Sequence, residues 1–121
     1  MAQHNETGKN GETIAKEYII KKGYEILETN WRFQKAEVDI IAKYQNRIIA
    51  IEVKTRSSIN FGRPQDFVNK KKIRLLLKAL DHYLNSKDLD FELRFDIIAI
   101  TIKDSNHQIE HLEDAFCIFD P

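Results

Sequence analysis

Apolar and polar residues follow helical spacing in two parts of the chain and strand-like spacing in the others. Helices are predicted over 10–22, where Gly23 supplies a C-terminal stop, and within 68–85, where an apolar stripe runs for about four turns. Between the two helical patterns, a turn-rich loop is expected over 57–67. The remaining apolar runs predict strands at 24–33, 37–44, 47–55 and 92–102, with a further short strand near 107–111.

The order helix, three strands, helix, strand and tail predicts an α/β fold with a central mixed β-sheet flanked by helices. With 121 residues and no linker, a single domain spanning 1–121 is expected. One cysteine, Cys117, excludes a disulfide framework or a multi-cysteine metal site and is expected in the core. No signal-peptide pattern and no run of membrane-spanning length occur, so a cytoplasmic protein without a membrane partner is expected.

The two central predicted strands form a hairpin, and a two-residue turn sets the register between them. In this register Asp39 faces Glu52. One step further from the turn, Glu37 faces Lys54. Because side chains alternate with a period of two, this register separates a charged face from an aliphatic face. The aliphatic face comprises Val38, Ile40, Ala42, Ile49, Ile51 and Val53.

Carboxylates that face each other repel, and in a partly buried site one of them has a raised pKa. A divalent cation removes this conflict, since carboxylates, waters and a backbone carbonyl are the ligands that Mg²⁺ favours. Lys54 follows Glu52 by two residues and points to the same face, where it can orient a water or stabilise charge on a phosphate. The alternative is a surface ion pair between Glu37 and Lys54, which would contribute little to stability. Charges inside Ile/Val/Ala runs favour the functional interpretation.

A net charge of zero argues against a strongly basic nucleic-acid binder, but the charges are unevenly distributed. Residues 54–78 contain eight basic side chains and one acidic, whereas residues 79–121 contain three basic and ten acidic. The basic segment supplies candidate contacts to DNA phosphates. A solvated helix face is the alternative, although basic residues in a first helical turn oppose the helix dipole, so some other gain is expected there. The candidates are Arg56, Lys70, Lys71, Lys72 and Arg74.

An Asp followed about a dozen residues later by Glu-x-Lys on the next strand resembles the motif of the PD-(D/E)XK nuclease superfamily. Nearly the whole chain resembles the bacterial YraN-type proteins, predicted endonucleases similar in fold to archaeal Holliday-junction resolvases. Two departures occur: Ala36 stands where the family often has glycine, and Val38 replaces the proline before Asp39. The motifs that carry the resemblance are Gly11-Glu12 with Ala15 and Tyr18, Lys22-Gly23-Tyr24, Ile26-Leu27, Asn30-Trp31-Arg32, Glu37-Val38-Asp39-Ile40-Ile41-Ala42, Glu52-Val53-Lys54-Thr55-Arg56, Phe61-Gly62 with Pro64, and Phe95-Asp96-Ile97-Ile98-Ala99.

This resemblance implies a restriction-endonuclease-like fold, in which three strands form an antiparallel meander and the helix after them crosses to a fourth strand. It also implies that Asp39 and Glu52 hold Mg²⁺, for which Mn²⁺ substitutes, together with the backbone carbonyl of Val53. Lys54 would position the attacking water. Glu12 resembles a first-helix glutamate that many superfamily members bring to the same site. Its alternative is a first-turn glutamate stabilised by the helix dipole.

Other residues are weaker candidates. Gln65 corresponds to a glutamine that some superfamily nucleases use. Asp96 lies inside an apolar run, and a structural role, bonded to a backbone group or to Arg94, is favoured over a catalytic one. For Trp31 and Tyr44, a role in packing is favoured over the alternative of a base-stacking platform. The four histidines lie apart in the sequence and lack the spacing of zinc ligands.

The expected function is therefore that of a Mg²⁺-dependent endodeoxyribonuclease with one or two metal ions, acting on branched or otherwise non-standard DNA. A resolvase-like enzyme would need a homodimer to cut two strands symmetrically. The first alternative is a non-catalytic nucleic-acid-binding module that keeps the nuclease fold, and the second is a structural partner protein without nucleic acid. Metal binding separates the enzyme from both alternatives, and salt-dependent DNA binding separates the two alternatives from each other.

Overall fold

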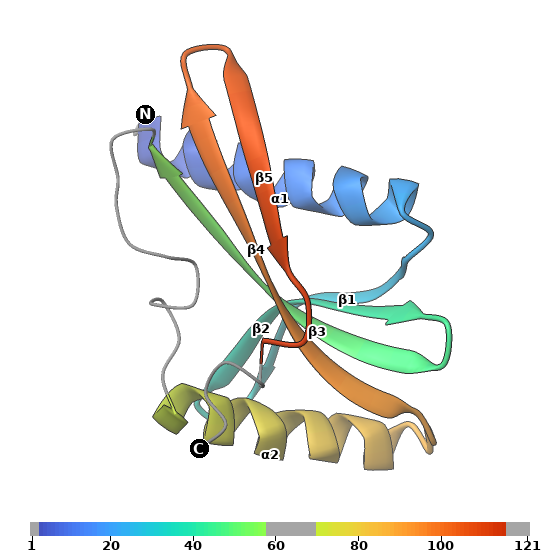
Figure 1. Ribbon diagram of the computed structural model, residues 1–121. Coiled ribbons are helices and arrows are strands. Elements are labelled where there is room, and N and C mark those ends of the chain that lie inside the picture. The colour runs from blue at the N-terminus through green and yellow to red at the C-terminus, as the bar shows by residue number, and fades with distance from the viewer. Residues whose placement is uncertain (1–2, 58–69, 116–121) are drawn as a thin grey trace.

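The structure is a computed structural model that describes residues 3–57 and 70–115 (Figure 1). The predicted helices and strands are present, but the first helix begins seven residues earlier than predicted. Gln65 and Cys117 lie outside the described residues, as does most of the predicted 57–67 loop. The elements are α1 (Gln3–Lys21), β1 (Glu25–Phe33), β2 (Ala36–Tyr44), β3 (Arg47–Ser57), α2 (Lys70–Ser86), β4 (Glu92–Lys103) and β5 (Asn106–Leu112).

The strands of the described residues form one five-stranded sheet in the order β1-β2-β3-β4-β5. β1, β2 and β3 are an antiparallel meander, and β4 lies parallel to β3 after the chain has passed through α2. β5 then pairs antiparallel with β4. The predicted α/β fold with a mixed sheet, a meander and a crossover strand is confirmed.

The two helices cover opposite faces of the sheet, and a separate hydrophobic cluster lies beneath each of them (Figure 1). Beneath α1, Ala15 and Ile19 pack against aliphatic residues of β2, β3 and β4. Beneath α2, Leu76, Leu80 and Tyr83 pack against the opposite face of the same strands. Strands buried on both faces need apolar side chains at successive positions, which explains the nearly continuous aliphatic runs of β3 and β4. No helix in the described part of the chain is both long enough and apolar enough to cross a membrane.

The two aromatic residues expected to pack do so. The ring of Tyr44 is stacked on that of Tyr24, with 4.4 Å between centroids. Trp31 packs edge-on against Tyr83 of α2 at 5.3 Å. The first contact joins the end of β2 to the residue directly before β1, and the second ties the meander to α2, where Trp31 also contacts the cluster beneath that helix.

Candidate metal centre

The predicted hairpin register is correct, but the paired region is shorter than expected. Ile40 pairs with Ile51, as predicted, and the ladder between β2 and β3 ends there. The earlier part of β2 pairs only with β1, while β3 remains paired with β4 up to Ser57. Beyond this point β2 and β3 run in different directions (Figure 1). Asp39 and Glu52 therefore lie where two strands separate, rather than opposite each other within a ladder.

This separation also changes two expectations about the faces of the hairpin. Val38 packs in the cluster beneath α2, not with the aliphatic residues beneath α1, because β2 follows β1 alone before Ile40. Glu37 does not face Lys54. Instead, its carboxylate forms an ion pair with the guanidinium of Arg32 on β1, at 2.8 Å.

Asp39 is held by a backbone group of the neighbouring strand. Its Oδ2 accepts a hydrogen bond from the backbone N–H of Val53 at 2.8 Å. The carboxylate thus takes the place of a strand partner for an amide that would otherwise lack one. Burial raises the pKa of Asp39 to about 6, the bond from Val53 opposes the rise, and the negative charges of Glu52, Glu12 and Glu37 add to it. Asp39 therefore lies at a point of excess negative charge.

Glu52 has a basic partner that the sequence pattern did not identify. Nζ of Lys72, in the first turn of α2, lies 2.6 Å from Oε2 of Glu52. The Glu52 side chain is 12% exposed and that of Lys72 is 40% exposed. Lys72 had been predicted to contact DNA phosphates, whereas here it neutralises a candidate metal ligand. Its unfavourable position in the helix dipole was the signal that it had a specific partner.

Glu12 reaches the same region from α1. Because α1 begins at Gln3, Glu12 lies in the helix interior, and its interpretation as a dipole-stabilised first-turn glutamate is wrong. Oε1 of Glu12 is buried and has no hydrogen-bond partner among the described residues. Lys16, one turn further along, lies 3.8 Å away, beyond hydrogen-bonding distance.

A glycine allows α1 to approach this end of β3. A Cβ built on Gly11 would lie 1.8 Å from Oγ1 of Thr55, so no other residue fits there without a shift of the Thr55 side chain, the helix or the strand. Gly11 precedes Glu12 directly, and Thr55 follows Lys54 directly. The close helix–strand contact therefore positions Glu12 next to the strand that carries Glu52 and Lys54.

The predicted DNA-contacting residues fall into three groups. Lys70, Lys71 and Arg74 are exposed on α2. Lys72 is bound to Glu52. Arg56 reaches toward β4 and β5, where its Nε donates a hydrogen bond to Thr101 at 3.3 Å and its Nη2 lies 3.8 Å from the carboxylate of Glu110. Lys54, the predicted catalytic lysine, has an exposed side chain on β3.

The carboxylates of this centre are few for a metal site built from protein ligands alone. Within residues 3–57 and 70–115, no three or more His, Cys, Asp or Glu side chains form a ready-made metal cage. Mg²⁺, however, is commonly held by one or two carboxylates, with waters and a substrate phosphate completing the shell. Asp39 and Glu52, together with Oε1 of Glu12, which accepts no hydrogen bond from the described residues, fit that mode of binding.

Asp96 belongs to a second polar cluster, with structural partners. Its carboxylate accepts hydrogen bonds from Arg94 at 2.8 and 2.9 Å and from the backbone N–H of Asp114 at 3.0 Å. Nε2 of His111 lies 2.7 Å from its Oδ2. The structural role predicted for Asp96 is confirmed by these contacts. Nothing in the sequence indicated that His111, 15 residues away on β5, contacts Asp96.

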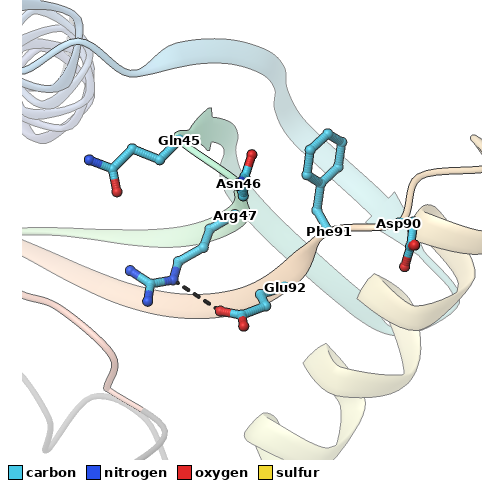
Figure 2. Close-up of a pocket in the computed structure, with 6 residues that line it drawn as sticks. All are labelled: Gln45, Asn46, Arg47, Asp90, Phe91 and Glu92. Atoms are coloured by element: carbon cyan, nitrogen blue, oxygen red, sulfur yellow. Dashed lines mark hydrogen bonds and ion pairs between the residues drawn. The ribbon is translucent and has the colours of Figure 1, made fainter.

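A pocket at the opposite end of β3 contains none of the predicted site residues. The guanidinium of Arg47 and the carboxylate of Glu92 form an exposed ion pair across it at 3.3 Å. Arg47 begins β3, roughly 16 Å along the strand from Glu52. The pocket is thus separate from the carboxylate cluster. It is lined by Gln45, Asn46, Arg47, Asp90, Phe91 and Glu92 (Figure 2).

Comparison with known proteins identifies relatives over almost the full chain. The model of a family described as "Uncharacterised protein family UPF0102" matches residues 11–100, which include all the carboxylates of the centre. UPF0102 proteins of Flavobacterium psychrophilum and Christiangramia forsetii are each 59% identical over 119 residues, covering 98% of this chain and 100% of the relative. A UPF0102 protein of Phocaeicola vulgatus is 48% identical over 116 residues, covering 96% of both chains. With this extent of similarity, the chain belongs to the UPF0102 family.

Proposed function

We propose that this protein is a Mg²⁺-dependent endodeoxyribonuclease of the PD-(D/E)XK type, with a restriction-endonuclease-like fold, that hydrolyses phosphodiester bonds in branched or non-standard DNA. The observation that carries the proposal is the gathering of buried carboxylates where β2 and β3 separate: burial raises the pKa of Asp39 to about 6, and the negative charges of Glu52 and Glu12 add to the rise. A carboxylate cluster of this kind is costly without a cation. A bound Mg²⁺ would offset the charge. It would also lower the pKa of a bound water, so that the water can lose a proton and attack a phosphodiester.

Each residue of the centre has a role that follows from its position. The Val53 amide fixes the orientation of Asp39, so that the carboxylate stays at the point of strand separation. Glu52 supplies the second carboxylate from β3. Lys54 lies two residues further on the same strand and is exposed, which suits a group that orients the water or stabilises charge on the phosphate. Lys70, Lys71 and Arg74 on α2 would bind DNA phosphates.

Metal binding is the first test. Millimolar Mn²⁺ should raise the melting temperature of the wild-type protein by several degrees and leave that of Asp39→Asn almost unchanged, because ligand binding to the native state stabilises it. The asparagine keeps an acceptor for the Val53 amide, so loss of the shift reports on the metal rather than on folding. Equal shifts in both proteins would remove Asp39 from the metal site.

Cleavage is the second test. A fluorescently labelled branched DNA should be nicked by the wild type with Mn²⁺, and nicking should disappear in Lys54→Ala while DNA binding persists. Lys103→Ala, an exposed lysine in the last position of β4, is the matched control and should cut like the wild type. DNA binding without any cleavage by the wild type would favour the non-catalytic nucleic-acid-binding module.

A further inference from the structure

Three aromatic rings lie next to one another at the edge of the sheet, where β1 meets α2. Phe33 of β1 is stacked on His82 of α2, with 4.1 Å between ring centroids and 23° between planes. Trp31, two residues earlier on β1, is nearly parallel to Phe33, at 6.2 Å and 6°. β1 is the first strand of the sheet and has no neighbour on its outer side within the described residues. The rings therefore form a small aromatic surface at an open edge.

This aromatic surface is only partly covered by the fold. One edge of the cluster is anchored in the core, since Trp31 packs against Tyr83. Trp31 and Phe33 themselves remain half-buried, and His82 is exposed. Aromatic rings dominate the energetics of interfaces because of the large apolar area that they bury. Such rings left accessible at a sheet edge are suited to a flat apolar ligand.

Positive charge accompanies the rings along α2. Lys71, Lys78 and His82 are spaced by seven and four residues, so they lie on one flank of the helix. Both lysines are exposed, and so is Lys35 in the turn that follows Phe33. The flank thus combines aromatic rings with cations, which is the chemistry that binds a single-stranded nucleic acid: the rings stack with bases and the cations bind phosphates.

Resting on the nuclease function proposed above, we infer that Trp31, Phe33 and His82 form a stacking platform for unpaired bases of a single-stranded DNA segment. Lys71 and Lys78 bind the phosphates of that segment. Inside a duplex, each base is covered on both faces by its neighbours and offers none to the rings, so the platform selects DNA with a single-stranded part. Lys72 lies about 15 Å from His82 along the axis of α2, so the same helix connects the platform to the candidate metal centre. The substrate is thus DNA that joins a duplex to a short single strand.

Trp31 is the only tryptophan of the chain, so its fluorescence reports directly on the platform. We would titrate the full-length protein, without divalent metal, with a short oligothymidine and with a blunt duplex of equal length. The single strand should quench Trp31 emission and bind more tightly than the duplex. Phe33→Leu and His82→Ala should each weaken binding of the single strand roughly tenfold and leave duplex binding unchanged. Phe91→Leu, a half-buried aromatic at the pocket of Figure 2, is the matched control and should bind like the wild type.

A surface variant keeps the test decisive if Phe33→Leu does not fold. Lys78→Ala should weaken binding of the single strand and lower its salt dependence by about one phosphate contact. Unchanged Trp31 emission, together with wild-type affinity in His82→Ala, would overturn the platform. Mn²⁺-dependent nicking of duplex DNA by the same preparation would then leave the nuclease proposal intact. Failure to bind either DNA would overturn both.

Discussion

The ammonium group of Lys72 lies 2.6 Å from Oε2 of Glu52, which links the first turn of α2 to the middle of β3. A divalent cation bound through Oε2 of this carboxylate would compete with the ammonium for that oxygen. Lys72 therefore has two consequences for the proposed centre. It neutralises Glu52 when no metal is bound, and it opposes metal binding.

Replacing Lys72 with methionine should strengthen metal binding. The ion pair is half-exposed and is expected to contribute about 1 kcal/mol at most, which corresponds to roughly a fivefold lower dissociation constant for Mn²⁺. Electron paramagnetic resonance of free Mn²⁺ measures this constant directly. Lys70→Met removes an exposed charge of the same helical turn and serves as the control. Weaker Mn²⁺ binding in Lys72→Met would show that the lysine supports the metal rather than competing with it.

The raised pKa of Asp39 predicts a specific dependence of stability on pH. Its value of about 6 in the folded protein exceeds the ordinary value of 3.8, so the folded state holds a proton that the unfolded state has released in this interval. The free energy of unfolding should therefore fall as pH rises from about 4 to about 6, by roughly 2 kcal/mol from this group. Asp39→Asn should remove this part of the decrease and be more stable than the wild type at pH 7 in the absence of metal. Urea denaturation across this pH range measures both effects, and a less stable Asp39→Asn at pH 7 would contradict the assignment.

Gly11 offers a test of the contact between α1 and β3. Alanine is favoured over glycine inside a helix by about 1 kcal/mol, so an isolated helix would gain stability from Gly11→Ala. Here the new Cβ would lie 1.8 Å from Oγ1 of Thr55, and we expect a loss of about 1–3 kcal/mol from overpacking instead. Adding Thr55→Ala should recover part of that loss, because it removes the atom in conflict. Chemical denaturation of the two single variants and the double variant gives the coupling free energy between Gly11 and Thr55. Additive effects would show that the contact is not formed.

The sequence predicted those features that depend on local pattern. Alternation along β2 and β3 determined the register, since only one parity keeps Ile40 and Ile51 on the same buried face. Where the ladder ends was not predictable from alternation. It depends on Asp39 bonding to the Val53 amide and on β2 following β1, which are tertiary features.

Partners distant in sequence were also missed. Lys72 is 20 residues from Glu52, and only the docking of α2 on the sheet brings them together. The start of α1 was missed because the residues before Gly11 have no apolar periodicity, and this error placed Glu12 in a first turn. The single indication of tertiary structure was indirect: basic side chains in the first turn of α2 oppose its dipole and so implied a compensating contact.

The cluster around Asp96 predicts a large loss of stability in Asp96→Asn. Burial alone would raise the pKa of Asp96, but the bonds with His111, Arg94 and the Asp114 amide outweigh it, so the pKa is lowered. The substitution leaves the buried guanidinium of Arg94 with only the half-exposed carboxylate of Glu113, 3.6 Å from its Nη1, as an anionic partner, and loss of the buried pair costs about 3–5 kcal/mol. A carboxylate with a lowered pKa stabilises the fold above the ordinary value of 3.8, and this contribution is lost as pH falls below it. Urea denaturation should therefore give a difference in the free energy of unfolding between wild type and Asp96→Asn that is largest at pH 7 and smaller at pH 3. The exposed Asp88→Asn serves as the control. A difference below about 1 kcal/mol at pH 7 would show that Arg94 finds another partner and that the cluster is not essential to the fold.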